Sequence, residues 1–355
     1  MNTSCPVQID VTIIVPCRNE QRFVSNFLQS LLAQDLTGIT WEVLIADGMS
    51  DDDTRAIIAA YCQKYPVRIL DNPQQVVSTG LNQAIAEARG RYILRMDVHT
   101  TYASDYVRQC LRVADDTGAD NVGGPWVPVG EGYIGTAIAA AFQSSFGTGM
   151  AKGHDPTYEG PVDTVYLGCW PRDVFSRIGL FDAQLVRNQD DEFNLRLRRI
   201  GAQVWQSPEI VSFYHPRSSL HALFRQYMQY GYWKVAVIRK HRLSASFRHL
   251  IPGIFVAVNG ILFLTYFSFW ITGLSHLSFA ALFSWMAISG AYLAFCLVAS
   301  FAAAGKHGWS LLPVLPLVFA TYHFGYGYGF LLGVAHLFRN EQSGIPNPAF
   351  TELTR

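Results

Sequence analysis

The chain has 355 residues, of which half are hydrophobic and only 15% charged, and its mean hydropathy is +0.15. One ordinary soluble domain is less apolar than this, so we expect the excess to be concentrated in part of the chain. The formal net charge is zero, so no nucleic-acid partner is predicted.

The cysteines are scattered and form no CxxC pair. We therefore expect reduced cytosolic or buried thiols, and neither a disulfide framework nor a zinc site. The N-terminus lacks a basic segment followed by an apolar run, so we expect no cleaved signal peptide and a front domain that stays in the cytosol. The six cysteines are Cys5, Cys17, Cys62, Cys110, Cys169 and Cys296.

Short apolar runs alternate with charged, helix-periodic stretches in the first half of the chain. The β-branched and apolar content predicts strands at 11–16, 41–47, 67–70 and 91–97, and a further short strand at 203–206. Helices are predicted between the first four strands, including 51–65 and 78–89. This alternation predicts an α/β fold with a mostly parallel sheet covered by helices.

Charged residues almost vanish after residue 250. The stretches 251–272 and 278–304 contain no Asp, Glu, Lys or Arg, and each exceeds the roughly 20 apolar residues that a membrane-spanning helix needs. The stretch 311–337 is also uncharged, but its prolines and its Gly-rich run at 325–329 predict a kinked span or a re-entrant element. Buried helices of a soluble protein are the alternative, and three successive runs favour the membrane.

The segment between these parts is rich in Tyr and Trp, has apolar residues at helical spacing, and ends in four basic residues at 239–242. An amphipathic, aromatic, basic helix is typical of the membrane interface. The basic cluster predicts that this side of the membrane is cytosolic. We therefore expect a front domain at 1–217, an interfacial region at 218–249, a transmembrane region of two to three helices at 250–338, and a tail at 339–355.

Two aspartates end predicted strands, and ligands of open α/β sheets bind at the carboxyl ends of strands. They are Asp47 and Asp97. Asp97 and His99 could share one divalent cation, where the carboxylate suits Mg²⁺ and the imidazole favours Mn²⁺. Such an ion could stabilise a departing diphosphate. The alternatives are turn or helix-cap aspartates and a surface histidine.

An acidic run, Asp190-Asp191-Glu192, precedes an apolar helical face. Acidic residues at a helix N-terminus cap it and complement its dipole. Alternatively, one carboxylate is a general base for an incoming hydroxyl. His215 follows the short strand at 203–206 and is either a third metal ligand, a diphosphate contact or a structural residue. The sequence has no P-loop, no GxGxxG after the first strand and no GxSxG.

Together these residues resemble the family 2 inverting glycosyltransferases, which have the GT-A fold, over about residues 9–234. The resemblance implies that Asp97 and His99 stand in the place of the family's DxD metal motif. It implies that Asp190, in the place of the ED pair, is the catalytic base. It also implies a nucleotide site in which Asp47 hydrogen-bonds uracil and the remaining contacts come from Pro16, Arg18, Glu20 and Asp97.

The DxH form and the runs at 168–172, 188–194 and 214–218 are similar to those of succinoglycan-type exopolysaccharide glucosyltransferases. Those enzymes add sugars to a polyprenyl-diphosphate-linked saccharide on the cytosolic membrane face. The resemblance implies a UDP-sugar donor, a lipid-linked acceptor, a place in the inner membrane and other polysaccharide-assembly proteins as partners. The residues that it implies as acceptor or diphosphate contacts include Trp170, Asp191 and Glu192.

The pattern departs from the family at His99, which replaces an Asp, and at Gln189, which replaces a Glu. Processive synthases carry QxxRW, whereas this chain has Tyr in place of the Arg, followed by Lys234. Gln229, Trp233 and Lys234 are predicted contacts of the diphosphate or acceptor, and the alternative is a set of interface aromatics. The C-terminal apolar region is short for a polymer channel, which predicts transfer of one sugar per acceptor.

The resemblance implies that Asp190 deprotonates the acceptor hydroxyl, which attacks the anomeric carbon with inversion as UDP departs. One alternative is transfer to polyprenyl phosphate, an ionised acceptor that needs no base. Another, from a different class, is a non-catalytic subunit that binds nucleotide sugars and serves assembly.

Overall fold

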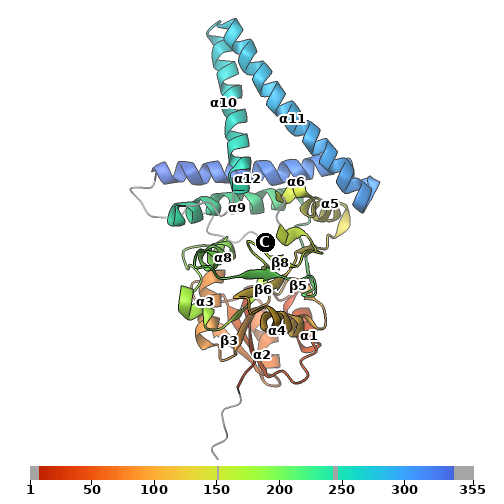
Figure 1. The fold of residues 1–355 in the computed structure, drawn as a ribbon, viewed down its shortest axis with the longest axis vertical. Helices are drawn as coiled ribbons and strands as arrows, with labels where there is room; N and C mark the ends of the chain where they lie inside the picture. Colours follow the sequence, from red (N-terminus) through yellow and green to blue (C-terminus); the bar gives the residue numbers. More distant parts are fainter. Residues whose placement is uncertain (1–7, 150–151, 243–246, 340–355) are drawn as a thin grey trace, which may run out of the picture. The chain divides into compact units, whose positions relative to one another are not determined.

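The computed structural model describes residues 8–149, 152–242 and 247–339. The chain forms two compact units (Figure 1). The first contains Met1–Val127 and Lys152–His215, and the second contains Pro128–Ala151 and Pro216–Arg355. Each is described by itself below.

The first unit is built on an eight-stranded sheet in the order β3-β2-β1-β4-β9-β6-β10-β8. The pairs β1–β2, β2–β3, β1–β4 and β6–β10 are parallel, whereas β9 runs antiparallel to β4 and β6. The predicted mostly parallel α/β sheet is thus confirmed. Its strands are β1 (Val11–Cys17), β2 (Trp41–Asp47), β3 (Val67–Asp71), β4 (Tyr92–Arg95), β6 (Asn121–Gly124), β8 (Gly160–Pro161), β9 (Tyr166–Pro171) and β10 (Val204–Gln206).

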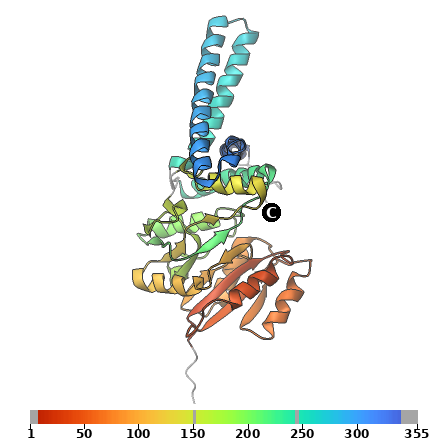
Figure 2. The same ribbon diagram turned by 90° about the vertical axis from the view of Figure 1, so that its right-hand side faces the viewer.

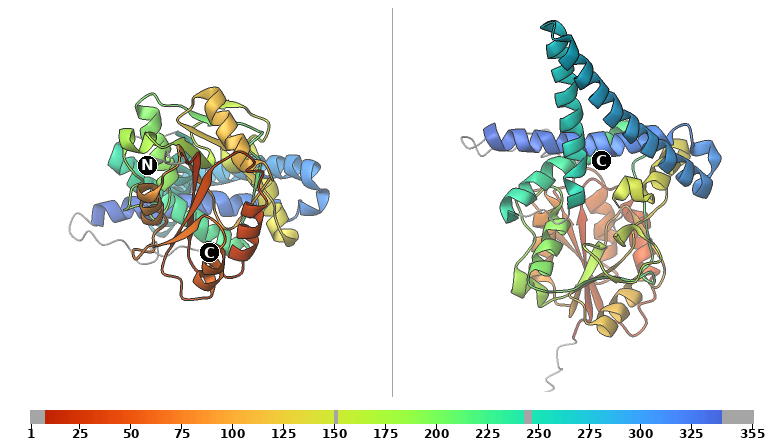
Figure 3. Two further views of the ribbon diagram at one scale, coloured as in Figure 1. Left: turned by 90° about the horizontal axis from the view of Figure 1, so that it is seen from below. Right: turned by 45° about the horizontal axis from the view of Figure 1, so that its top comes forward.

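Helices cover both faces of this sheet (Figure 3). Successive strand residues point to opposite faces, so the neighbours Ile13 and Ile14 are both fully buried but belong to different core clusters. The Ile13 cluster includes α1 and α4, and the Ile14 cluster includes α3 and α8. The helices are α1 (Val24–Leu32), α2 (Thr54–Cys62), α3 (Val77–Glu87), α4 (Tyr106–Thr117), α7 (Val174–Ile178) and α8 (Gln189–Arg199).

A small antiparallel pair joins two distant segments of the first unit. Strand β5 (Thr100–Tyr102) pairs with β11 (Ser212–Tyr214), and Tyr214 stands opposite Thr100. This pairing brings the segment that ends in His215 to the segment that follows Asp97. The other short elements are β7 (Val127–Pro128) and the 3₁₀ turn η1 (Lys152–His154).

The second unit is helical. Helices α9 and α12 lie side by side (Figure 1), and α10 and α11 form a long hairpin (Figure 2). Its elements are α5 (Gly132–Phe142), α6 (Ser145–Thr148), α9 (Leu220–His241), η2 (Phe247–His249), α10 (Ile251–Ile271), α11 (Ser275–His307), η3 (Trp309–Leu311) and α12 (Leu315–Arg339).

Two helical segments in the described part of the chain are long and apolar enough to cross a membrane. They are Phe247–Ile271 and Ser275–His307, with mean hydropathies of 2.0 and 1.9. Large apolar side chains such as Leu264 and Phe283 are exposed on them. An apolar surface of this extent suits a hydrocarbon environment better than water.

The third apolar stretch is a continuous helix, α12, whose start follows Pro313 and η3. Three of its glycines, Gly325, Gly329 and Gly333, lie where α9 approaches closely, and Gly327 lies against Pro252 of α10. A Cβ on Gly329 would lie 1.9 Å from the Met228 carbonyl oxygen, and a Cβ on Gly231 would lie 2.0 Å from that of Tyr326. The Gly-rich run therefore permits close packing of two helices, which is a different use from the kink or re-entrant turn that we expected.

The second unit also takes in residues 128–151, which the sequence prediction placed inside a front domain at 1–217. The reason is the apolar face of α5, since Ile138 and Ala141 are buried in one cluster with Val318 and Phe319 of α12. The Tyr322 hydroxyl also donates to the Ile138 carbonyl oxygen over 3.1 Å. The boundary after His215 lies close to the predicted one, and residues 340–355 of the predicted tail lie outside the described residues.

Within the described residues, no disulfide joins Cys17, Cys62, Cys110, Cys169 or Cys296. Burial raises the pKa of the Cys110 and Cys169 thiols, so both are neutral at physiological pH.

Candidate active site

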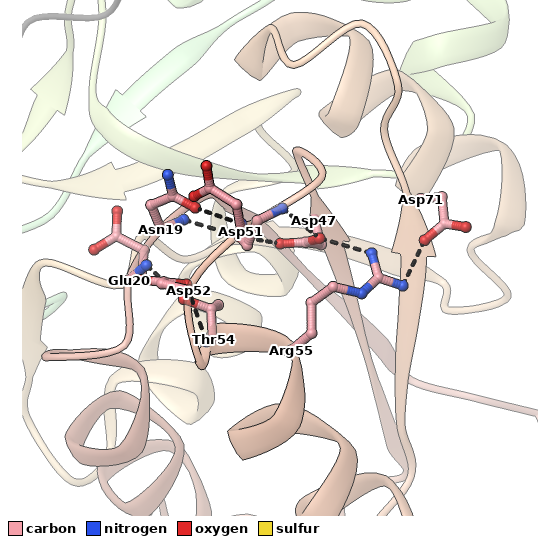
Figure 4. Close-up of polar contacts among 9 residues, drawn as sticks. Asn19, Glu20, Asp47, Asp51, Asp52, Thr54, Arg55 and Asp71 are labelled. Atoms are coloured by element: carbon pink, nitrogen blue, oxygen red, sulfur yellow. Dashed lines mark hydrogen bonds and ion pairs between the residues drawn. The ribbon is translucent and has the colours of Figure 1, made fainter.

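The loops after β1 and β2 are joined by reciprocal hydrogen bonds (Figure 4). The Asn19 amide donates to the Ser50 hydroxyl over 2.8 Å, and the Asp51 amide donates to the Asn19 side chain over 3.1 Å. The Glu20 amide donates to the Thr54 hydroxyl over 2.7 Å at the start of α2. These bonds fix the loops at the carboxyl ends of the neighbouring strands β1 and β2 to each other.

Asp47 holds the loop that follows its own strand. One carboxylate oxygen accepts from the Ser50 hydroxyl over 2.5 Å, and the other accepts from the Ser50 amide and, over 2.7 Å, from Arg55. Arg55 also donates a hydrogen bond to the Asp71 carboxylate at the end of β3, over 2.7 Å (Figure 4). Because the Asp47 side chain is 0% exposed, its direct contact with a nucleotide base stays a prediction.

The other nucleotide-site candidates lie at the same edge of the first unit. Pro16 is part of β1, and Arg18 is packed so tightly against Gly48 that a Cβ there would lie 3.1 Å from the Arg18 Cδ. The buried Glu20 carboxylate meets His99 Nε2 over 2.8 Å. The resemblance pointed to these residues, and the structure brings them together without testing their roles.

Asp97 and Asp190 are brought together by a residue that the sequence reasoning missed. Arg95 Nε and Nη2 donate to the two Asp97 oxygens over 2.9 and 3.0 Å, and Arg95 Nη1 lies 3.9 Å from Asp190 Oδ2. Burial alone would lower the pKa of the Arg95 guanidinium, but the Asp97 and Asp190 carboxylates outweigh burial and raise it. Arg95 is therefore a permanent cation between the two carboxylates.

The three residues predicted to hold a metal ion each contact another protein group. Asp97 pairs with Arg95, His99 with Glu20, and His215 Nε2 lies 3.1 Å from the Thr101 hydroxyl. In residues 8–149, 152–242 and 247–339, no group of three or more His, Cys, Asp and Glu side chains could hold a metal. The metal centre on Asp97, His99 and His215 therefore stays a prediction.

The acidic run begins α8, as predicted. The two interpretations of the run, stabilisation of the helix and a general base, apply to different residues. Glu192 is buried and binds Arg196, one turn along the same helix, over 2.8 and 2.9 Å. This pair encloses the Glu192 carboxylate, and its role as an acceptor contact stays a prediction. Asp190 remains 38% exposed, so of these two carboxylates it is the one that a substrate can reach. Asp191 is partly exposed, and its role stays a prediction.

Trp170 is a core residue, and its role as an acceptor contact stays a prediction. Its side chain is 1% exposed on β9. Its ring packs edge-on against Phe175, Phe181 and Phe193 at centroid distances of 5.8 to 5.9 Å. This aromatic cluster joins β9 to α7 and α8, and hence fixes the helix that carries Asp190.

Gln229, Trp233 and Lys234 lie on α9 in the second unit and are buried. Tyr232, in the place of the arginine of QxxRW, forms an edge-on ring contact with Trp233 at 5.7 Å. Their roles as diphosphate or acceptor contacts stay predictions.

Arg55 and Arg95 are the residues of this region that sequence reasoning missed. The available signal for Arg95 was a charged residue inside an apolar strand, because Ile93, Leu94 and Met96 around it are fully buried. A cation at such a position must be paired, and the nearest acidic residues in the sequence include Asp97.

Comparisons with known proteins agree with this architecture. Residues 12–156 match glycosyl transferase family 2. The chain is 32% identical over 243 residues to the succinoglycan biosynthesis protein ExoA of Rhizobium meliloti (strain 1021), which covers 68% of this chain and 73% of that protein. A second relative is a dolichyl N-acetyl-alpha-D-glucosaminyl phosphate 3-beta-D-2,3-diacetamido-2,3-dideoxy-beta-D-glucuronosyltransferase of Methanococcus voltae. It is 26% identical over 272 residues, and the match covers 72% of this chain and 84% of that protein.

A similar fold occurs in the mannosyltransferase PcManGT of Pyrobaculum calidifontis, solved with GDP-Man and Mn²⁺. The TM-score is 0.57 at 17% identity, over 94% of this chain and 89% of that one. The sheet and its covering helices thus form a GT-A-like α/β fold. The chain belongs to glycosyl transferase family 2, and it is related to exopolysaccharide and lipid-linked glycan glycosyltransferases.

Proposed function

We propose that this protein transfers one sugar from a UDP-sugar to a polyprenyl-diphosphate-linked saccharide, with inversion, in exopolysaccharide or surface glycan synthesis. The observation that carries the proposal is the pairing of Asp97 and Asp190 through Arg95 at the carboxyl end of β4. In open α/β sheets this end is where ligands bind. The relationship to ExoA supports the same class of product.

Asp190 is the proposed base. Its carboxylate stands at the first turn of α8 and is accessible, so it can accept the proton of an acceptor hydroxyl. The oxygen then attacks the anomeric carbon from the side opposite the UDP leaving group, which inverts the configuration. Positioning of the two substrates and fixed charges supply the remaining stabilisation.

Family 2 glycosyltransferases commonly use a divalent metal. The Mn²⁺ or Mg²⁺ expected here on Asp97, His99 and His215 stays a prediction, and no step of the proposed mechanism depends on it. Membrane attachment through α10 and α11, with the first unit in the cytosol, is part of the proposal. Its support is the apolar surface of these helices and the basic end of α9.

The test uses membranes that contain the full chain, a panel of UDP-sugars with a labelled sugar, and lipid extract. We expect one sugar to enter the lipid fraction and Asp190→Asn to lower its rate by at least about 100-fold while UDP binding persists. Full activity of Asp190→Asn would indicate an ionised polyprenyl phosphate as acceptor. UDP binding without transfer or donor hydrolysis by the wild-type chain would indicate a non-catalytic subunit and overturn the proposal.

A further inference from the structure

Arg95 is a cation enclosed in the first unit, with its side chain 8% exposed and fully buried neighbours on both sides in the sequence. Removing a guanidinium from water is costly unless anions and hydrogen bonds compensate it. Two carboxylates from distant parts of the chain, Asp97 and Asp190, lie within reach of it. The position of Arg95 therefore depends on both, and both depend on Arg95.

The three nitrogens of the Arg95 guanidinium differ in their hydrogen bonds. Nε and Nη2 form a two-pronged pair with Asp97, which fixes the plane of both groups. Nη1 has no hydrogen bond within the described part of the chain and lies 3.9 Å from Asp190 Oδ2. A buried donor without a partner is unfavourable, so a small shift of Asp190 toward it is favoured. Such contacts in enzymes often shorten only when substrate is bound.

We propose that Arg95 is a positioning residue for sugar transfer, which orients the Asp190 carboxylate toward the acceptor hydroxyl and holds Asp97 at the donor end of the sheet. This inference rests on the proposed function and deepens it. Arg95 itself is too enclosed to touch a substrate, so it acts through the two carboxylates.

The planar fork of arginine matters for this role. A lysine at position 95 would keep the charge but supply only one point of attachment, so it could not hold Asp97 by two bonds and face Asp190 as well. A methionine would keep most of the volume and remove both the charge and the hydrogen bonds. Arg95→Lys and Arg95→Met thus separate charge from geometry.

The experiment measures kcat at saturating donor, per amount of folded full-length protein, with folding and UDP binding measured on the same preparations. We expect Arg95→Met to lower kcat roughly 10- to 100-fold and Arg95→Lys to fall between it and the wild type. The matched control is Arg91→Met. Arg91 lies in the adjoining sequence but pairs with exposed Asp115 over 2.6 Å, so its loss should leave kcat unchanged.

A double-mutant cycle tests whether Arg95 acts through Asp190. If it does, Arg95→Met lowers the residual rate of Asp190→Asn by a smaller factor than it lowers the wild-type rate, because one of the two residues that it orients is already disabled. Effects that multiply, or a wild-type kcat in folded Arg95→Met, would overturn the inference. Should Arg95→Met fail to fold, Arg95→Lys in both backgrounds completes the same cycle.

The two proposals fail in different ways. The proposed function fails if the wild-type chain transfers no sugar, and the inference about Arg95 fails with it. The inference alone fails if the wild-type chain is active and Asp190→Asn is inactive while the Arg95 variants behave like Arg91→Met.

Discussion

Asp47 shows how one buried carboxylate organises the substrate edge of the sheet. Its charge is compensated by Arg55 over 2.7 Å and by the Ser50 amide and hydroxyl. Arg55 is itself partly exposed and also binds Asp71, which is well exposed. The same guanidinium therefore makes one enclosed and one solvent-screened ion pair, and the two pairs should differ in strength.

Arg55→Met should destabilise the protein more than loss of its outer partner. Removing the cation leaves a buried carboxylate undercompensated, which should lower the free energy of unfolding by about 1–3 kcal/mol. Asp71→Asn removes only an exposed pair and should cost less than about 1 kcal/mol. Urea denaturation of the full chain in detergent measures both. Equal losses for the two variants would contradict this ranking.

At the residue scale, local sequence identified the carboxylates but not what holds them. Asp97 follows an apolar strand and Asp190 begins an amphipathic helix, and both are patterns that a short window contains. The approach of Arg95 to Asp190 joins residues 95 positions apart, and it depends on the packing of α8 beside the sheet. The enclosure of Trp170 depends on the same packing, so no local pattern indicates it.

Strand β9 shows, at the scale of an element, that contacts between distant segments cannot be seen in a local sequence pattern. It is the strand that runs antiparallel between β4 and β6, and it presents Trp170 to three phenylalanines from α7, α8 and the segment between them. The cluster ties the helix that carries Asp190 to the centre of the sheet. Its contribution should therefore be to stability and not to recognition of the acceptor.

Trp170→Ala should lower the free energy of unfolding by about 3–5 kcal/mol, because it removes a fully enclosed indole and leaves a cavity. Trp170→Phe keeps an aromatic ring and should cost less. Chemical denaturation measures these changes, and acceptor KM is determined for whichever variant folds. If Trp170→Phe raised acceptor KM several-fold at unchanged stability, the acceptor-contact prediction would be right and the core assignment wrong.

The close contact of α9 with α12 depends on glycine at particular positions. In Gly329→Ala the new methyl group would meet the Met228 carbonyl oxygen, so the helices must separate, at a cost of about 1–3 kcal/mol. Gly290→Ala is the matched control, since a Cβ there has no neighbour within 4 Å in the described structure. Thermal unfolding in detergent should show a lower midpoint for the first variant only. A lower midpoint for both would point to helix backbone effects and against the packing argument.

Element positions in the first unit were largely readable from period and composition, because β1, β2, β3 and β4 are short segments in which apolar residues predominate. The assignment of residues 128–151 was not readable in this way. α5 looks like any short apolar helix, and its membership of the second unit follows from contact with α12, nearly two hundred residues later. Long-range packing, which no local pattern records, decides that boundary.

At the scale of the whole molecule, the number of membrane crossings decides where the chain emerges. In the described part of the chain, the two helices α10 and α11 are long and apolar enough to span a membrane. They are antiparallel and joined by a short turn at 272–274. Basic residues lie at both ends of this hairpin, at the end of α9 and at Lys306 and His307 of α11. Because basic residues favour the cytosolic side, crossings by α10 and α11 place both ends of the hairpin there. A crossing by α12 would carry only its own end outside, but α12 lies along α9, the helix that ends in the basic cluster.

We therefore predict that the end of α12 lies on the same side of the membrane as the first unit, in the cytosol. A reporter that fluoresces only in the cytosol, fused after Arg355, should be active, and one that is active only outside should be silent. The control is the same pair of reporters fused after Leu274, at the turn of the α10–α11 hairpin, where the pattern should reverse. Outside activity of the Arg355 fusion would mean that α12 crosses the membrane as a third span. Cytosolic activity at both positions would mean that neither α10 nor α11 crosses, and the apolar surface of the hairpin would then need another partner.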